Sequence, residues 1–283
     1  MRKDKYTEQD GGKDHRKNKR RFFSNATHMS TTDPDAKVAK KNGKPRMICY
    51  SAMMAVDTEN HVITHMSAEL SHKKDSRYLI DTTLKTKERI ESLGLKMDTV
   101  LADTGFSSGE NYHILDKENI DAYIPVHGSF KATREGFEYD EKTDSYTCSQ
   151  GQTLPYTRNS SSGGYLKKRY TSSKKICKSC PIKQGCINSR GFKQIEHTIH
   201  RVYYDQMIRK LKSEKGRLTY QLRMHTVEPV FGSLQQHYGL RWINTRGKDL
   251  ASKVMMMAAA ALNLKKWVKS IREKAKNTLN SVH

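Results

Sequence analysis

The alternation of apolar and polar positions predicts a hairpin followed by a helix. Residues 47–56 and 62–70 are two apolar runs, partly β-branched or aromatic, and the turn-like segment 57–60 separates them. Such a pair is typical of an antiparallel hairpin. Apolar residues then recur at helical spacing over residues 79–93. Gly94 closes this pattern, so we expect a helix that ends there.

The next part of the chain alternates short strands with a helix. Residues 99–102 and 122–125 are short apolar runs that predict strands. Between them, Ser107 and Glu110 fit an S-x-x-E capping box, which predicts a helix from about residue 108 to residue 118. The order hairpin, helix, strand, helix, strand predicts an α/β fold.

Residues 128–200 do not continue this order of strands and helices. They are basic and rich in Ser, Thr, Gly, Lys and Cys, with short strand-like pieces. From about residue 203 the pattern becomes helical again. The last helix carries apolar residues at alternating three- and four-residue spacing, which predicts a core or packing helix. These residues are Leu250, Val254, Met257, Ala261, Leu264, Val268 and Ile271. We therefore expect a basic arm at 1–27, disordered, a first core part at 28–127, a Cys-containing insertion at 128–202 and completing helices at 203–283.

Two isolated acids are candidate site residues. Asp103 follows a predicted strand directly, where it is either a turn residue that holds backbone amides or part of a site at the sheet edge. Glu228 lies in a long apolar-periodic region, where a carboxylate is costly unless it is paired, solvated or bound to metal. It either forms an ion pair with Arg223 or binds a metal. Pro229 predicts that Glu228 lies at a kink or at a helix start, where the helix dipole favours a carboxylate.

The charge of the chain narrows the class of partner. The 283 residues include 52 Lys and Arg against 30 Asp and Glu, a formal charge of +22. This excess indicates a polyanion, either nucleic acid or an anionic membrane. The longest apolar run, 254–262, is too short to span a bilayer, and the polar N-terminus is unlike a secretory signal, so nucleic acid is favoured. The basic residues expected to contact DNA are Lys167, Lys168, Arg169, Lys174, Lys175, Arg241 and Arg246.

Four of the five cysteines lie close together in the sequence. Cys177 and Cys180 form a C-x-x-C pair, Cys186 follows, and Cys148 is more distant. In the reducing compartment that we expect, metal binding or free thiols are favoured over disulfides. The four thiols could form a tetrahedral zinc site, and free thiols are the alternative.

Several segments, in order, resemble the motifs of bacterial insertion-sequence transposases of the DDE type, which have a ribonuclease-H-like fold. The resemblance covers about residue 28 to the end. The motifs are Ser30-Thr-Thr-Asp-Pro-Asp-Ala36, Val56-Asp-Thr-Glu-Asn-His-Val-Ile-Thr64, Leu101-Ala-Asp-Thr-Gly-Phe106, the cysteine segment 177–186, Thr226-Val-Glu-Pro-Val-Phe-Gly232 and Ile243-Asn-Thr-Arg-Gly247.

This resemblance implies DNA transposition by strand cleavage and transfer. Two Mg²⁺ ions roughly 4 Å apart would activate the attacking oxygen and stabilise the leaving oxygen, held by carboxylates from separate elements. Asp103 would be the second acid and Glu228 the third, with Tyr220 and Arg223 in supporting roles. Gln235 stands where some relatives carry a basic residue. The implied partners are the DNA of element ends and target and further copies of the chain, in the bacterial cytoplasm at the nucleoid.

The first acid of the family lies on a strand upstream of the segments seen here. Asp33, Asp35 and Asp57 are the nearest substitutes, and all three fall in predicted turns. The resemblance therefore implies an N-terminally truncated copy that lacks the first strand and has little or no catalytic activity alone. Two alternatives follow: a non-catalytic DNA-binding remnant of a transposase, and an adaptor module stabilised by zinc.

Overall fold

The computed structural model describes residues 23–40, 43, 45–131, 133–162 and 165–280. The chain divides into two compact units: unit 1 comprises residues 1–101 and 217–283, and unit 2 comprises residues 102–216. Helices and several β-sheets are both present, which confirms the predicted α/β class. Most of the predicted N-terminal arm, residues 1–22, lies outside the described residues. Within 23–27, the Asn25 side chain makes both hydrogen bonds to the backbone of Val38, at 3.0 and 2.7 Å.

Unit 1 begins with an antiparallel sheet. Its strands β1 (Lys37–Ala39), β2 (Met47–Val56) and β3 (Ile63–Leu70) pair in the order β1-β2-β3. The register places Ala52 opposite Ala68, so the predicted hairpin is confirmed. After the 3₁₀ turn η2 (Asp75–Arg77), helix α1 (Leu79–Ser92) follows as predicted, and strand β4 (Thr99–Leu101) ends this segment. Gly94 adopts a φ of 73°, the left-handed conformation in which helices commonly end.

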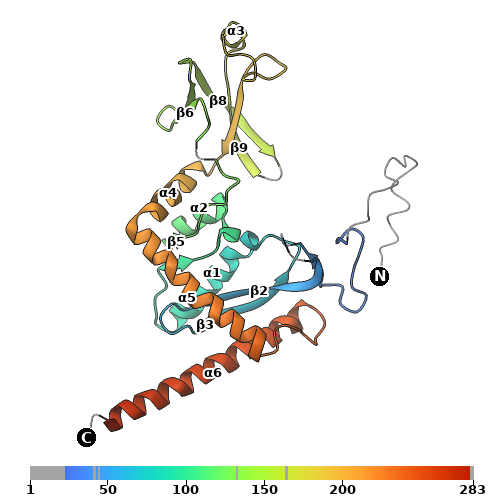
Figure 1. Ribbon diagram of the computed structural model, residues 1–283, viewed down its shortest axis with the longest axis vertical. Coiled ribbons are helices and arrows are strands. Elements are labelled where there is room, and N and C mark those ends of the chain that lie inside the picture. Colours follow the sequence, from blue (N-terminus) through green and yellow to red (C-terminus); the bar gives the residue numbers. More distant parts are fainter. Residues whose placement is uncertain (1–22, 41–42, 44, 132, 163–164, 281–283) are drawn as a thin grey trace. The chain divides into compact units, whose positions relative to one another are not determined.

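The long helix α6 (Lys248–Asn280) covers the edge of this sheet (Figure 1). Its Ser252 hydroxyl accepts a hydrogen bond from the Ala68 N–H at 3.0 Å. Its Asn263 amide binds both the N–H and the C=O of Ile63, each at 2.9 Å. Because β3 is an edge strand of the described sheet, its outer backbone groups need partners, and these two polar side chains supply them.

The prediction that the apolar stripe of α6 is its core face is wrong. The buried residues of α6 are Ala251, Met255, Ala258, Ala259 and Leu262, which join Ile63, Met66 and Ala68 in one core cluster. Stripe residues such as Met257 and Leu264 are exposed. The alanines let the helix approach the sheet closely, and the same face carries Ser252 and Asn263. The buried residues also recur at three- and four-residue spacing, so apolar periodicity fits both faces, and the face that turns inward is the one that carries the partners of the edge strand.

Helix α5 (Glu214–His237) contradicts the prediction that Glu228 lies at a helix start. Pro229 is inside the helix, and Glu228 precedes it well beyond the first turn. A proline inside a helix costs about 3 kcal/mol or more. Val230 and Leu234 are buried in the same cluster as α6, and each such side chain gains about 1.5–3 kcal/mol on burial. Burial on this face therefore offsets the hydrogen bond that the proline removes. Because Glu228 is not at a helix start, the helix dipole does not stabilise its carboxylate.

Unit 2 contains two smaller layers. The first holds the 3₁₀ turn η3 (Thr104–Phe106), helix α2 (Gly109–Lys117), strand β5 (Asp121–Tyr123) and helix α4 (Arg201–Lys212). The second is a five-stranded antiparallel sheet in the order β10-β9-β8-β7-β6, with helix α3 (Lys174–Lys178) after β9. Its strands are β6 (Phe137–Asp140), β7 (Ser145–Cys148), β8 (Thr153–Ser162), β9 (Tyr165–Thr171) and β10 (Gln194–Thr198).

The start of α2 differs from the predicted capping box. Ser108 is the N-cap and makes no side-chain capping bond. The Ser107 hydroxyl instead accepts hydrogen bonds from the Tyr112 hydroxyl at 2.8 Å and from the His127 N–H at 3.1 Å. Gly109 fits against α4, because a Cβ at this position would lie 2.5 Å from the Cβ of His200. The helix start is therefore fixed by packing on α4 and not by a capping box.

Candidate catalytic acids, cysteine cavity and basic residues

Asp103 is the second residue after β4 and caps the short helix η3. Its Oδ1 accepts the Thr104 N–H at 2.7 Å, and the residue is exposed. The neighbouring Ala102 N–H donates to the Tyr123 carbonyl of β5 at 3.3 Å, which holds this part of the backbone beside the strand. The carboxylate thus has the backbone contact of a turn Asp, while its exposure leaves it accessible to a cation.

Glu228 lies on α5 with its side chain 64% exposed. Its Oε1 is 3.6 Å from Nη1 of Arg223, whose own side chain is only 15% exposed. The structure therefore brings Arg223 and Glu228 together, as the ion-pair interpretation expects. Tyr220 lies one turn before Arg223 on the same helix and is half-buried. Because Glu228 is exposed, solvent weakens this ion pair, and the carboxylate stays open to solvent.

The structure places Asp103 in unit 2 and Glu228 in unit 1. Their joint coordination of a metal therefore stays a prediction. Over the parts of the chain that the structure describes, no three His, Cys, Asp or Glu side chains are grouped closely enough to hold a metal ion.

The three substitute acids have structural partners in unit 1. Asp33 accepts hydrogen bonds from the Tyr50 hydroxyl at 2.8 and 2.7 Å. Burial, together with this carboxylate, raises the pKa of Tyr50 well above its ordinary value. Asp35 accepts the Lys248 N–H at 3.2 Å, and Asp57 accepts the Asn60 N–H at 2.6 Å in the hairpin turn. Asp57 therefore has the turn contact that its sequence context predicts, whereas Asp33 and Asp35 accept hydrogen bonds from residues that are distant in the sequence.

Four cysteines from separate elements of unit 2 line one cavity of about 390 Å³. Cys148 ends β7, Cys177 lies on α3, and Cys180 and Cys186 follow in the next loop. All four are half-buried free thiols, and the Cys177 thiol donates to the Ser172 hydroxyl at 3.0 Å. Apolar side chains, among them Phe137, Leu154, Ile176 and Ile187, line the rest of the wall. The fold thus brings the distant Cys148 to the C-x-x-C pair.

The predicted DNA-contacting residues fall into two kinds. Lys168 forms an ion pair with Asp144 at 2.9 Å, and Arg169 forms one with Glu196 at 2.8 Å. These two charges on β9 are partly neutralised within the sheet, which weakens the expectation that they bind phosphate. Lys174 and Lys175 are exposed on α3, while Lys167 is half-buried. Arg241 and Arg246 are exposed in the loop between α5 and α6, next to the exposed Trp242.

A buried chain of hydrogen bonds in unit 2 was not predicted from the sequence. Arg201 Nη1 donates to the Tyr146 hydroxyl at 2.7 Å, and that hydroxyl lies 2.9 Å from Nδ1 of His197. Nε2 of His197 lies 2.9 Å from the Tyr170 hydroxyl, which donates to Asp144 at 2.7 Å. Since each hydroxyl has one proton, His197 is assigned as neutral with its proton on Nε2.

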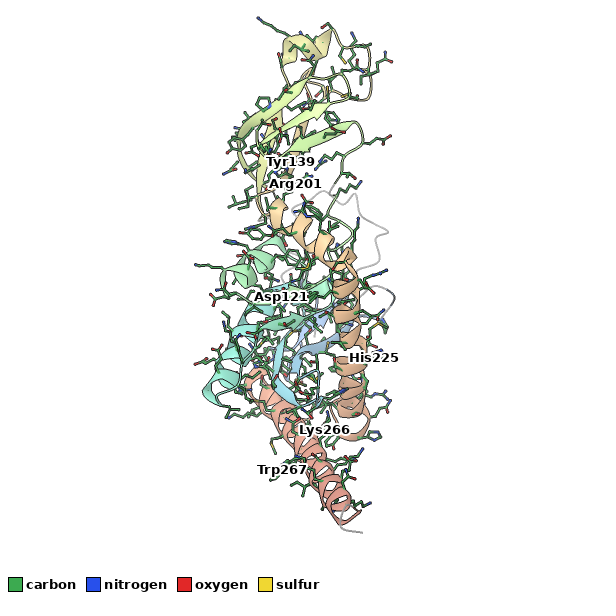
Figure 2. The ribbon with its side chains drawn as sticks, turned by 90° about the vertical axis from the view of Figure 1, so that its left-hand side faces the viewer. Asp121, Tyr139, Arg201, His225, Lys266 and Trp267 are labelled. Carbon is green, nitrogen blue, oxygen red and sulfur yellow. The ribbon has the colours of Figure 1, made fainter. Side chains whose placement is uncertain are left out.

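Electrostatics agree with this assignment. Burial, together with the nearby Arg201 guanidinium, lowers the pKa of His197 to about 4. The guanidinium also stacks over the Tyr139 ring at 4.6 Å, and Figure 2 shows these two side chains next to each other. The only sequence signal was a histidine at an alternating position of a short strand, which is too weak to predict such a chain.

One family model, described as a transposase DDE domain, matches residues 147–268 of the chain. This match supports a DDE-type transposase. The matched segment contains Tyr220, Arg223 and Glu228 and all four cysteines of the cavity. No match was found among curated proteins or among solved structures. At the level of the family the function is DNA transposition.

Among the described residues of this transposase, no helix combines the length and the apolar character that crossing a bilayer requires.

Proposed function

We propose that this transposase binds DNA and contributes a Mg²⁺ site for strand cleavage and transfer, with Asp103 and Glu228 as metal ligands. The observation that carries the proposal is the domain match over residues 147–268, which contains Glu228 together with Arg223 and Tyr220. The charge of +22 suits a polyanionic substrate. The ribonuclease-H-like fold that the resemblance implies belongs to this proposal.

The donor chemistry fits a hard divalent cation. Mg²⁺ prefers oxygen ligands and keeps several waters, so its protein ligands must be open to solvent. Asp103 and Glu228 are both exposed carboxylates. Oδ1 of Asp103 also accepts the Thr104 N–H, which orients the carboxylate. Arg223 beside Glu228 would hold the Glu228 carboxylate in orientation. The bound metal would stabilise the charge that develops on the phosphoryl oxygens.

The DNA contacts would centre on the loop between α5 and α6. Arg241 and Arg246 are exposed there and can reach phosphates, while the exposed Trp242 ring can stack on an unpaired base. Lys174 and Lys175 on α3 would add phosphate contacts. Binding of this kind is independent of sequence and falls steeply with salt.

Fluorescence anisotropy with a labelled duplex tests the DNA-binding proposal. Arg241→Glu with Arg246→Glu should weaken binding at least about tenfold and reduce the salt slope by about 2, because each lost phosphate contact removes about one unit of slope. Lys85→Glu with Lys96→Glu makes the same charge change on unit 1, at exposed lysines that already face Asp81 and Asp98. This control should change affinity much less. Equal losses in both variants would show only a general charge effect and overturn the proposed interface.

We also propose that the cysteine cavity holds a structural Zn²⁺. Four thiolates are a common donor set for tetrahedral zinc, and the cavity brings all four to one place. The thiols line the cavity without being grouped as a metal site among the described residues, so zinc would draw them inward. A small sheet with few buried apolar residues gains most from such a closure.

Metal analysis of the chain purified under reducing conditions tests this proposal. We expect one zinc per chain, lost in Cys177→Ser and retained in Cys49→Ser. Cys49 is the matched control, because it is a half-buried free thiol on β2 in the other unit. Absence of zinc in the wild type, or equal content in the two variants, would show that the cavity thiols are simply free.

A further inference from the structure

The stripe that was predicted to be the core face of α6 is an apolar surface on unit 1, exposed at every position except the half-buried Val254. Met257 is 72% exposed and Leu264 is 58% exposed, and Leu250, Val268 and Ile271 are exposed as well. Met255 and Leu262, which precede Met257 and Leu264 by two residues, are buried against the sheet. Two residues correspond to about 200° around a helix, so the stripe faces away from the sheet. Exposed apolar patches of this extent mark interaction sites.

The spacing of the stripe is that of a coiled coil. Steps of four and three residues alternate without interruption from Leu250 to Ile271. Val254, Ala261 and Val268 then occupy the a positions of a heptad, and Leu250, Met257, Leu264 and Ile271 occupy the d positions. β-branched residues at a with Leu at d favour a parallel pair of helices. An apolar seam of more than three heptads is long enough to specify a coiled coil.

The residues that flank the stripe suit a second copy of the same helix. In a parallel pair, each g residue faces the e residue of the next heptad in the partner. Ala260 then faces Lys265, and Trp267 faces Arg272, while Ala258, the counterpart of Lys253, is buried against the sheet of its own copy. No Lys or Arg faces another basic residue in these pairs, although the helix is strongly basic. Trp267 is exposed on α6 (Figure 2) and offers its ring to the Arg272 guanidinium of the other copy.

We propose that this transposase self-associates through a parallel coiled coil formed by the exposed stripe of α6 with the same stripe of a second copy. The opposite face of α6 is fixed to the sheet by Ser252 and Asn263, so the helix is already ordered before it binds. A preorganised helix loses little conformational entropy on association. The inference rests on unit 1 alone and is independent of the metal and DNA sites.

Sedimentation equilibrium of the full chain tests the proposal, in high salt so that DNA does not bridge copies. At about 10 µM protein, where a micromolar dimer is populated, the wild type should have twice the chain mass of 32.5 kDa. Met257→Glu and Leu264→Glu should each be monomeric. Met256→Glu is the control, since Met256 is the adjacent methionine, 45% exposed and outside the stripe. A monomeric wild type, or loss of the dimer in Met256→Glu as well, would overturn the proposal.

Cysteine crosslinking tests the parallel arrangement and does not depend on the charge substitutions. Equivalent d residues face each other in a parallel pair, so Leu264→Cys should crosslink two copies under mild oxidation. Met256→Cys carries the same added thiol outside the stripe and should crosslink no more than the wild type does. Equal crosslinking of the two variants would contradict the α6 pairing.

Discussion

The cores of the two units are built from different kinds of contact. The core of unit 1 is aliphatic: helices α5 and α6 lay Val230, Leu234 and Met255 on a three-stranded sheet. The core of the unit 2 sheet is largely aromatic, with Tyr146 and Tyr170 fully buried. Its buried hydroxyls have defined partners in the chain from Arg201 to Asp144. Apolar burial is non-directional, whereas a buried hydroxyl needs its partner. Unit 1 should therefore respond to changes in volume, and unit 2 to the loss of single polar atoms.

The largest effect should come from a cavity in unit 1. Leu234→Ala removes a fully buried side chain of α5 and should lower the free energy of unfolding by about 3 kcal/mol. Leu222→Ala, at an exposed leucine of the same helix, should cost less than about 0.5 kcal/mol. Urea denaturation followed by circular dichroism measures both values. Equal losses would contradict the assignment of the core face of α5.

The loss of a single buried hydroxyl should lower the stability of unit 2. Tyr170→Phe keeps the ring but removes the group that donates to Asp144 and lies 2.9 Å from Nε2 of His197, leaving buried polar groups unpaired. We expect a loss of about 2 kcal/mol. Tyr156→Phe is the matched control, because its hydroxyl is on an exposed side chain. If both variants lose the same amount, the buried chain has no special role in stability.

The same chain predicts a pH dependence. His197 titrates at about 4 in the folded protein and near 6.5 when unfolded, so the unfolded state binds more protons between these values. Stability should be fully present above pH 6.5 and should decrease by roughly 1 to 2 kcal/mol as pH falls through the folded pKa. His197→Gln should flatten this profile. His225→Gln, on the exposed side of α5, should leave it unchanged, and a profile unchanged by His197→Gln would contradict the assignment.

The smallest effect concerns the attachment of α6 to the edge strand. Asn263→Leu should cost about 1 kcal/mol, because the N–H and C=O of Ile63 lose their partners while little apolar burial is lost. The Ile63 amide should also exchange its hydrogen faster. Asn277→Leu, at an exposed position of the same helix, is the control. Unchanged exchange at Ile63 in Asn263→Leu would show that α6 is held by apolar contacts alone.

The sequence predicted the positions of helices and strands better than it predicted which face of a helix is buried. Periodicity located the hairpin, α1 and the C-terminal helices, because these signals are local. Helix α2 was placed correctly from a capping box that the structure does not form. Periodicity did not select the buried face of α6, which carries Ser252 and Asn263 as partners of β3, a contact about 190 residues away in sequence. The prediction of a helix start at Glu228 was wrong, because the burial of Val230 and Leu234 stabilises α5 as a helix that continues past Pro229.

The candidate site was predictable only as separate parts. The C-x-x-C spacing indicated Cys177 and Cys180, and the fold was needed to bring Cys148 to the same cavity. Arg223 and Glu228 are five residues apart, and not the three or four of neighbouring side chains on a helix, so the structure was needed to show their contact at 3.6 Å. The chain through His197 joins residues from β7, β9 and β10 and α4, and no local pattern encodes it.

Calorimetric titration with Mn²⁺, as a substitute for Mg²⁺, tests most directly whether Asp103 and Glu228 share one metal site. Asp103→Asn and Glu228→Gln should each weaken binding at least about tenfold, and the double variant should lose no more than either alone, because both remove the same site. Asp57→Asn, at a turn carboxylate bound to the Asn60 N–H, should leave binding unchanged. Unchanged binding in both single variants, or losses that add as for independent sites, would contradict the shared site.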